Sequence, residues 1–188
     1  MVRHSLAWFK PGRTIKVNDK MQTYEYKLSA PPGKNFAHGF NPHYSPGEML
    51  KLGVFEGKYL NDCQDEFPRE WFKNAKVSEE KADPSINLFG IKSRLSLKEW
   101  KRRKWIKGPD VRGWFQWYCR YWIGRRDPEL DAHQIARWRS FRRHSGQIRA
   151  SIQRMKPQQR PKTREELKKH RPRQRQALLQ WAYNPWET

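Results

Sequence analysis

The residues best suited to catalysis lie between positions 53 and 72, where two glycines accompany five carboxylates. Lys58 has the side chain of an amine nucleophile, and Asp62 and Glu66 have those of a general base or a metal ligand. The competing interpretation is structural, because a basic protein also needs carboxylates for internal ion pairs and helix starts. We therefore take Lys58, Asp62 and Glu66 as candidate catalytic residues whose role the sequence alone leaves open.

The spacing of the other polar residues gives little support to metal or cofactor chemistry. Six histidines and two cysteines occur, but none has the Cys-x-x-Cys or His-Glu-x-x-His spacing that holds zinc. A Gly-x-x-x-x-Gly-Lys-Ser phosphate loop is also missing from the sequence. We expect no metal ion and no cofactor, and we expect Cys63 and Cys119 to be reduced thiols.

The charge of the chain points to an anionic partner. Lysine and arginine number 40 against 19 aspartate and glutamate residues, which gives a net charge of +21. Residues 91 to 188 hold 27 of the basic and 8 of the acidic side chains, so nearly all of the excess lies in the second half. A charge excess confined to one part of a chain indicates a binding face, and we predict a nucleic acid as the partner, DNA in preference to RNA.

Arginine suits phosphate binding because its planar guanidinium can donate two hydrogen bonds to one phosphate group and can stack on bases. No acidic residue occurs between Asp131 and Glu165. The candidate nucleic-acid-binding residues are Arg102, Arg103, Arg120, Arg125, Arg126, Arg139, Arg142, Arg143, Arg173 and Arg175.

Aromatic residues are abundant, with ten tryptophans in the chain. In the segment from 114 to 122, Trp114, Trp117, Tyr118 and Tyr121 form one helical stripe, and an adjoining apolar stripe covers most of the remaining circumference. This pattern predicts a buried central helix. Only a minority of the rings are then expected to stack on bases.

Helix-start signals divide the second part of the chain. Ser45 to Glu48 and Thr163 to Glu166 have the pattern of a capping box, as does Ser96 to Glu99. Asp110 is a candidate cap for a helix from 111 to 123. Asp127 followed by proline predicts a long helix that continues to Met155, and a last helix is expected from 172 to 183.

The N-terminal part, by contrast, is rich in proline and glycine and has one alternating stretch near residues 23 to 28. We predict a mainly α protein, a compact bundle of four to six helices with an irregular N-terminal arm. The arm spans residues 1–45, and a single helical nucleic-acid-binding domain spans residues 46–188.

Several motifs resemble a family of hypothetical proteins found in fungal, plant and viral genomes. The matching stretches are GVFEGKYLND at 53–62, DEFP at 65–68, NLFG at 87–90, RGWFQWYCRY at 112–121 and RQRQALLQWAY at 173–183. The likeness covers roughly residues 35 to 185 and implies a single folded unit. It brings no activity with it, so no catalytic role is carried over.

Three functions remain open on the sequence. The first is a DNA-binding protein with arginine-rich helices on phosphates and some aromatic side chains on bases. The second is an enzyme acting on DNA, such as a glycosylase, another base-modifying enzyme or a nuclease. The third is an RNA-binding structural component of a ribonucleoprotein, threaded along RNA by the N-terminal arm.

The expected location is intracellular, cytoplasmic or nuclear. The first acidic residue is Asp19, so the N-terminal stretch also resembles an organelle transit peptide, although Pro11 and Gly12 interrupt any amphipathic helix there. No apolar run in the sequence approaches the roughly 20 residues that span a bilayer. We therefore expect no membrane partner.

Overall fold

Helix α4 (Trp114–Trp122) forms the centre of the core in the computed structural model, which describes residues 3–187. Every side chain from Trp114 to Tyr121 is buried, which confirms the prediction of a buried central helix. The helix begins after Gly113, whose φ of 85° lies in the left-handed region. A Cβ at this position would lie 3.2 Å from the Trp100 ring, so both the backbone and the packing favour glycine.

Local sequence signals account for most helix starts. Ser45 and Thr163 form complete capping boxes with the glutamates three residues later, and the Asp127 side chain accepts a hydrogen bond from the Leu130 amide. The α-helices are α1 (Pro46–Leu52), α2 (Glu70–Lys73), α3 (Leu97–Arg102), α4 (Trp114–Trp122), α5 (Pro128–Phe141), α6 (Arg143–Gln153), α7 (Arg164–Lys169) and α8 (Pro172–Gln180). Short 3-10 turns lie at Leu6–Trp8, Phe55–Gly57, Gln64–Glu66, Pro84–Ile86 and Pro157–Gln159.

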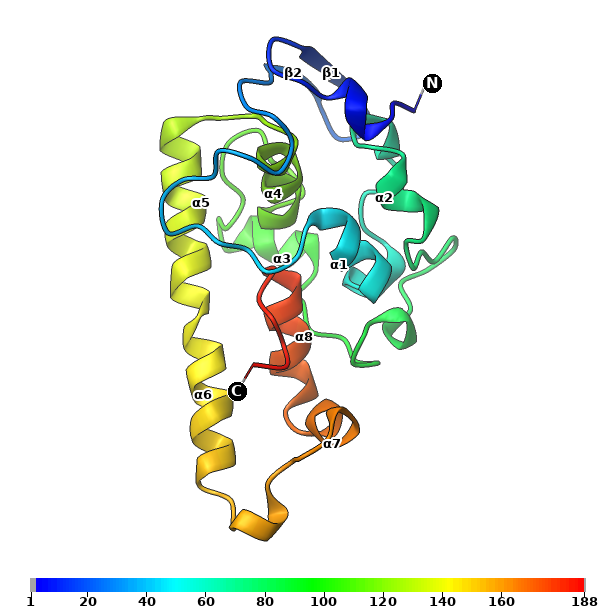
Figure 1. The fold of residues 1–188 in the computed structure, drawn as a ribbon. Helices are drawn as coiled ribbons and strands as arrows, with labels where there is room; N and C mark the ends of the chain where they lie inside the picture. Colours follow the sequence, from blue (N-terminus) through cyan, green and yellow to red (C-terminus); the bar gives the residue numbers. More distant parts are fainter. Residues whose placement is uncertain (1–2, 188) are drawn as a thin grey trace.

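The expected long helix after Asp127 is divided in two. Helix α5 ends at Phe141 and α6 begins at Arg143, and the two follow each other as one column along the molecule (Figure 1). Helix α8 packs beside α6, and α7 lies at the far end of α8. Ile148 is the one buried residue of α6, so most of this second half of the column is accessible to solvent.

The N-terminal residues are part of the core, which corrects the prediction of a separate arm. Strands β1 (Thr14–Asn18) and β2 (Thr23–Lys27) form an antiparallel hairpin in which Ile15 faces Tyr26, and both side chains are buried. Phe40 is fully buried and its ring contacts the Trp117 and Trp138 rings. The ribonucleoprotein hypothesis loses its main support, because this segment is folded against the core of its own chain.

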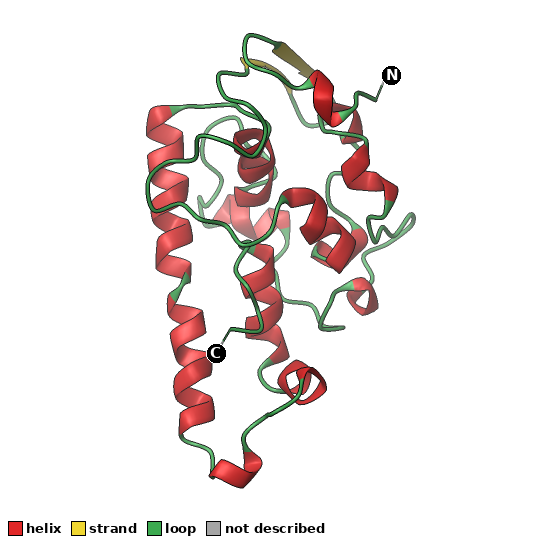
Figure 2. Cartoon of the chain, viewed as in Figure 1, coloured by secondary structure: helices red, strands yellow, loops and turns green. Residues whose placement is uncertain are grey.

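The fold is compact and mostly helical, with one small two-stranded sheet among the described residues (Figure 2). The predicted bundle of four to six helices is only approximate. Helices α1, α2, α3 and α7 have at most two turns each, and long loops join them. Across residues 3–187, no helix has both the length and the apolar character needed to cross a bilayer.

Candidate nucleic-acid interface

Two of the predicted phosphate-binding arginines are buried in ion pairs. Arg120 contacts the Glu66 carboxylate through Nε at 2.5 Å and Nη2 at 3.0 Å. Arg125 contacts both carboxylate oxygens of Asp110, at 2.9 and 2.7 Å. Asp110 therefore neutralises buried arginines and does not cap α4, and the predicted phosphate contacts of Arg120 and Arg125 are wrong.

Two further candidates hold the backbone in place. Arg175 is fully buried and donates to the carbonyls of His170 and Pro185, and burial lowers its pKa to about 10. The prediction that it contacts phosphate is also wrong. Arg126 is half-buried and donates to the carbonyls of Lys34 and Asn35, while its guanidinium lies 3.9 Å from the Tyr121 ring centroid.

The candidate catalytic residues do not form one constellation. The Lys58 ammonium donates to the Glu79 carbonyl at 2.9 Å, and Asp62 pairs with Arg112 at 2.8 Å. Glu66 is buried against Arg120. The two carboxylates thus belong to ion pairs, as the structural interpretation of the sequence allows, and Lys58 faces a different part of the chain.

One group of potential metal ligands occurs near these ion pairs. Ligand atoms of Asp19, Cys63 and Glu66 lie within 4.8 Å of one another. Burial would raise the pKa of Asp19, but hydrogen bonds from Arg112 and from the Met21 amide outweigh it and hold the pKa below its ordinary value. Burial raises the pKa of the Cys63 thiol. The group therefore fits an arginine-neutralised core better than a metal centre, and both cysteines are free thiols, as predicted.

The remaining predicted arginines are exposed. Arg102 and Arg103 both contact Glu99, so one carboxylate serves two guanidinium groups. Exposed side chains on and between α5 and α8 define what we call the basic surface. Its members are Arg139, Arg142, Arg143, Arg149, Arg154, Lys156, Arg160, Lys162, Arg164, Lys168, Lys169, Arg171 and Arg173.

The basic surface lacks close ion pairs. Within residues 126–187, no lysine or arginine forms an ion pair within 4.0 Å, although such pairs are common in the first part of the chain. Several of these side chains donate only to backbone carbonyls, as Arg139 does to His38. Arg149 and Arg154 were not predicted to bind phosphate, although both lie in the acid-free run between Asp131 and Glu165.

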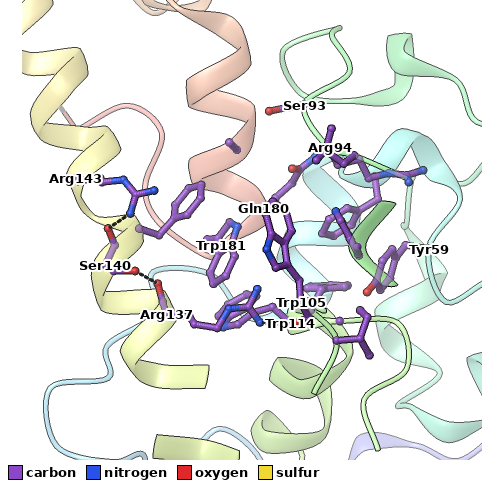
Figure 3. A pocket seen from close by; sticks show the side chains of 18 residues that line it. Tyr59, Ser93, Arg94, Trp105, Trp114, Arg137, Ser140, Arg143, Gln180 and Trp181 are labelled. Carbon is purple, nitrogen blue, oxygen red and sulfur yellow. Dashed lines mark hydrogen bonds between the residues drawn. The ribbon is translucent and has the colours of Figure 1, made fainter. Parts of the chain in front are cut away.

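A pocket of about 400 Å³ lies beside this surface (Figure 3). Arg137, Ser140 and Arg143 border it on one side, Tyr59 and Arg94 lie on the other, and Trp181 lies between them. We call it the aromatic pocket. Its ring-bearing lining residues are Phe55, Tyr59, Trp100, Trp105, Trp114, Phe115, Phe141 and Trp181.

The rings pack into two walls. Trp181 is stacked on Phe141 and on Trp114, with centroids 4.7 Å apart in each pair. On the opposite wall, Phe55 packs 4.4 Å from Tyr59. Trp105, another lining residue, is 42% exposed, which is unusual for so large an apolar side chain. The pocket therefore offers aromatic faces to a ligand as well as to its own core.

A few polar groups accompany these rings. Gln180 is only 5% exposed, and its amide nitrogen has no hydrogen-bond partner among the described residues. The Arg94 Nε lies 2.8 Å from a carboxylate oxygen of buried Glu56. Arg137 lies over the Trp181 ring at 5.4 Å, and burial lowers its pKa from its ordinary value.

The backbone beside the pocket is strained. Phe55 and Glu56 have φ values of 54° and 55°, in the left-handed region that side chains other than glycine rarely adopt. Such strain is commonly found at functional sites. It places the Phe55 ring in the pocket wall and the Glu56 carboxylate against Arg94.

Sequence reasoning did not identify the aromatic pocket, because its lining comes from five distant parts of the chain. The one available signal was Trp105, which follows the exposed cluster from Lys101 to Lys104. No protein-family model, curated protein or solved structure matches the chain. The site is therefore described from its geometry alone.

Proposed function

We propose that the protein binds nucleic acid, with DNA as the preferred partner, through the basic surface of α5 to α8. The observation that carries the proposal is the absence of ion pairs from residues 126–187, where thirteen exposed lysines and arginines form the basic surface. Such a surface repels itself unless anions neutralise it, and a polyphosphate backbone supplies them in series.

The length of the basic surface favours a long polyanion as its partner. Its side chains extend from Arg139 on α5, along α6, through the turn at Pro157–Gln159 and onto α7 and α8. Helices α5 and α6 follow each other as one column, so their members of the basic surface can contact successive phosphates of one strand or duplex.

We expect Arg102 and Arg103 to contribute less to phosphate binding than the basic surface does, because both already pair with Glu99. Arg126 is engaged with backbone carbonyls and is left out of it. No reaction is proposed, because Lys58, Asp62 and Glu66 have separate partners. We also propose an intracellular location for the protein, cytoplasmic or nuclear, because its nucleic-acid partner is found there.

Fluorescence anisotropy across a salt series tests the proposal. Labelled duplex DNA, single-stranded DNA, RNA and polyglutamate are compared at the same protein concentrations. We expect DNA to bind most tightly and its affinity to fall linearly in a log–log plot against salt, as counterion release requires. Absence of DNA binding at low salt, or equal binding of polyglutamate, would contradict the proposal.

A further inference from the structure

The aromatic pocket and the basic surface share a residue. Arg143 lines the pocket and is also an exposed member of the basic surface. Arg137, six residues earlier and on α5, lines the same side of the pocket (Figure 3). A nucleic-acid strand that Arg143 holds by a phosphate would therefore lie beside the pocket.

The walls of the pocket suit a flat ring. Trp105 is an exposed lining residue, and the rings of Phe141, Trp181 and Trp114 form a stack between α5 and α4. Every nucleobase has a π-face, and stacking on tryptophan holds a base with little dependence on its identity. The volume of about 400 Å³ falls in the range of roughly 300 to 1,000 Å³ of sites for small organic ligands.

Gln180 provides an independent sign of a ligand. Its amide nitrogen is buried and has no hydrogen-bond partner among residues 3–187, and such an unpaired buried polar group destabilises the folded protein. The residue lines the pocket, where a bound base edge would offer the missing hydrogen-bond partner.

The charges of the lining residues indicate which kind of flat ligand the pocket favours. Arg94, Arg137 and Arg143 line the pocket, and the neighbouring carboxylate of Glu56 contacts only Arg94 among them. The site is therefore positive and favours a ring that carries phosphate. We propose that the aromatic pocket receives one unstacked nucleobase of a DNA strand, an inference that rests on the proposed function.

Three short labelled duplexes test the pocket. One is fully paired, the second has a single unpaired adenosine, and the third has an abasic nucleotide at that place, so that only the base differs between the last two. Free dAMP is a fourth probe. We expect the wild-type protein to bind the adenosine duplex about tenfold more tightly than the abasic one, as stacking of one base predicts.

Two variants locate this preference. Trp105→Ala removes an exposed ring, and Gln180→Leu removes the unpaired amide while keeping a similar volume; both should bring the adenosine-to-abasic ratio close to one. Gln153→Leu, at an exposed position on α6, is the matched control and should leave the ratio unchanged. Gln180→Leu should also keep or raise the melting temperature of the free protein, because a buried unpaired group is lost.

The outcomes separate the pocket from the basic surface. Equal affinity for the adenosine and abasic duplexes overturns the pocket proposal while DNA binding stands. The same conclusion follows if dAMP binds in a Gln180-dependent way but the adenosine duplex gains nothing, since the pocket then takes a free nucleotide. A Gln180→Leu variant that is less stable yet keeps the full ratio also contradicts the proposal. Absence of binding to every duplex at low salt overturns the proposed function itself.

Discussion

The Glu66 carboxylate accepts two hydrogen bonds from the Arg120 guanidinium and a third, at 2.9 Å, from the Tyr26 hydroxyl. These contacts join the N-terminal hairpin, the 3-10 turn at Gln64–Glu66 and α4 inside the core. A buried charge that loses its partner destabilises the folded state far more than an exposed one.

Glu66→Ala should therefore lower the free energy of unfolding by about 3 to 5 kcal/mol, as measured by urea denaturation. Asp65→Ala is the matched control, because Asp65 contacts Arg3 at 3.5 Å on the surface, where a pair is worth about 0 to 1 kcal/mol. Equal and small losses in the two variants would show that Glu66 is not a core ion-pair residue.

Removal of residues 1–30 should abolish cooperative thermal unfolding. The deletion removes buried Ile15, Tyr26 and Leu28, and it leaves Glu66 without its hydroxyl donor. A shorter deletion of residues 1–3 removes the exposed ion pair of Arg3 with Asp65 and is the control. A folded protein of near-normal stability after the longer deletion would support the extended arm that the sequence predicted.

The elements of this fold could be predicted where short-range chemistry determines them. Ser45, Thr163 and Asp127 start helices at the expected positions, and the stripes around Trp117 indicated the buried helix. The N-terminal residues could not be placed in this way, because their burial depends on contacts such as the one between Phe40 and Trp138, almost a hundred positions apart.

The candidate site was predictable only in part, for a related reason. Charge counting treats every arginine as available, but Arg120 and Arg125 are neutralised by Glu66 and Asp110, from other parts of the chain. Arg142 and Arg143 lie in an acid-free run and are exposed as expected. The sequence thus identified the basic segment, while the buried arginines and the aromatic pocket required the tertiary structure.

The contact of α6 with the α7–α8 end should weaken at acidic pH. His144 lies 3.4 Å from Gln174, and His170 lies 3.2 Å from Ser151. Burial, aided by neighbouring arginines, lowers the pKa of both histidines below the ordinary value of 6.5. The unfolded chain then binds more protons, so their contribution is complete above about pH 6.5 and is lost as the pH falls through the lowered values.

Thermal unfolding between pH 8 and pH 5 measures this effect, and NMR titration of the imidazole signals gives the pKa values. The variant His144→Gln/His170→Gln should lose less stability over this interval than the wild type. His38→Gln is the control, since His38 is exposed in the loop before Phe40 and lies outside α6, α7 and α8. Imidazole pKa values at or above 6.5 in the folded protein would contradict the prediction.

The central claim is that the basic surface binds DNA, and the salt dependence of affinity in charge variants tests it most directly. The triple variant Arg142→Gln/Arg149→Gln/Arg154→Gln removes three exposed charges from the basic surface, and Lys10→Gln/Lys27→Gln/Lys51→Gln removes three exposed charges from the first half of the chain. For duplex DNA, we expect the slope of log affinity against log salt to fall by about 2 to 3 for the arginine variant and to stay unchanged for the lysine variant. Equal slopes in the two variants would contradict the account.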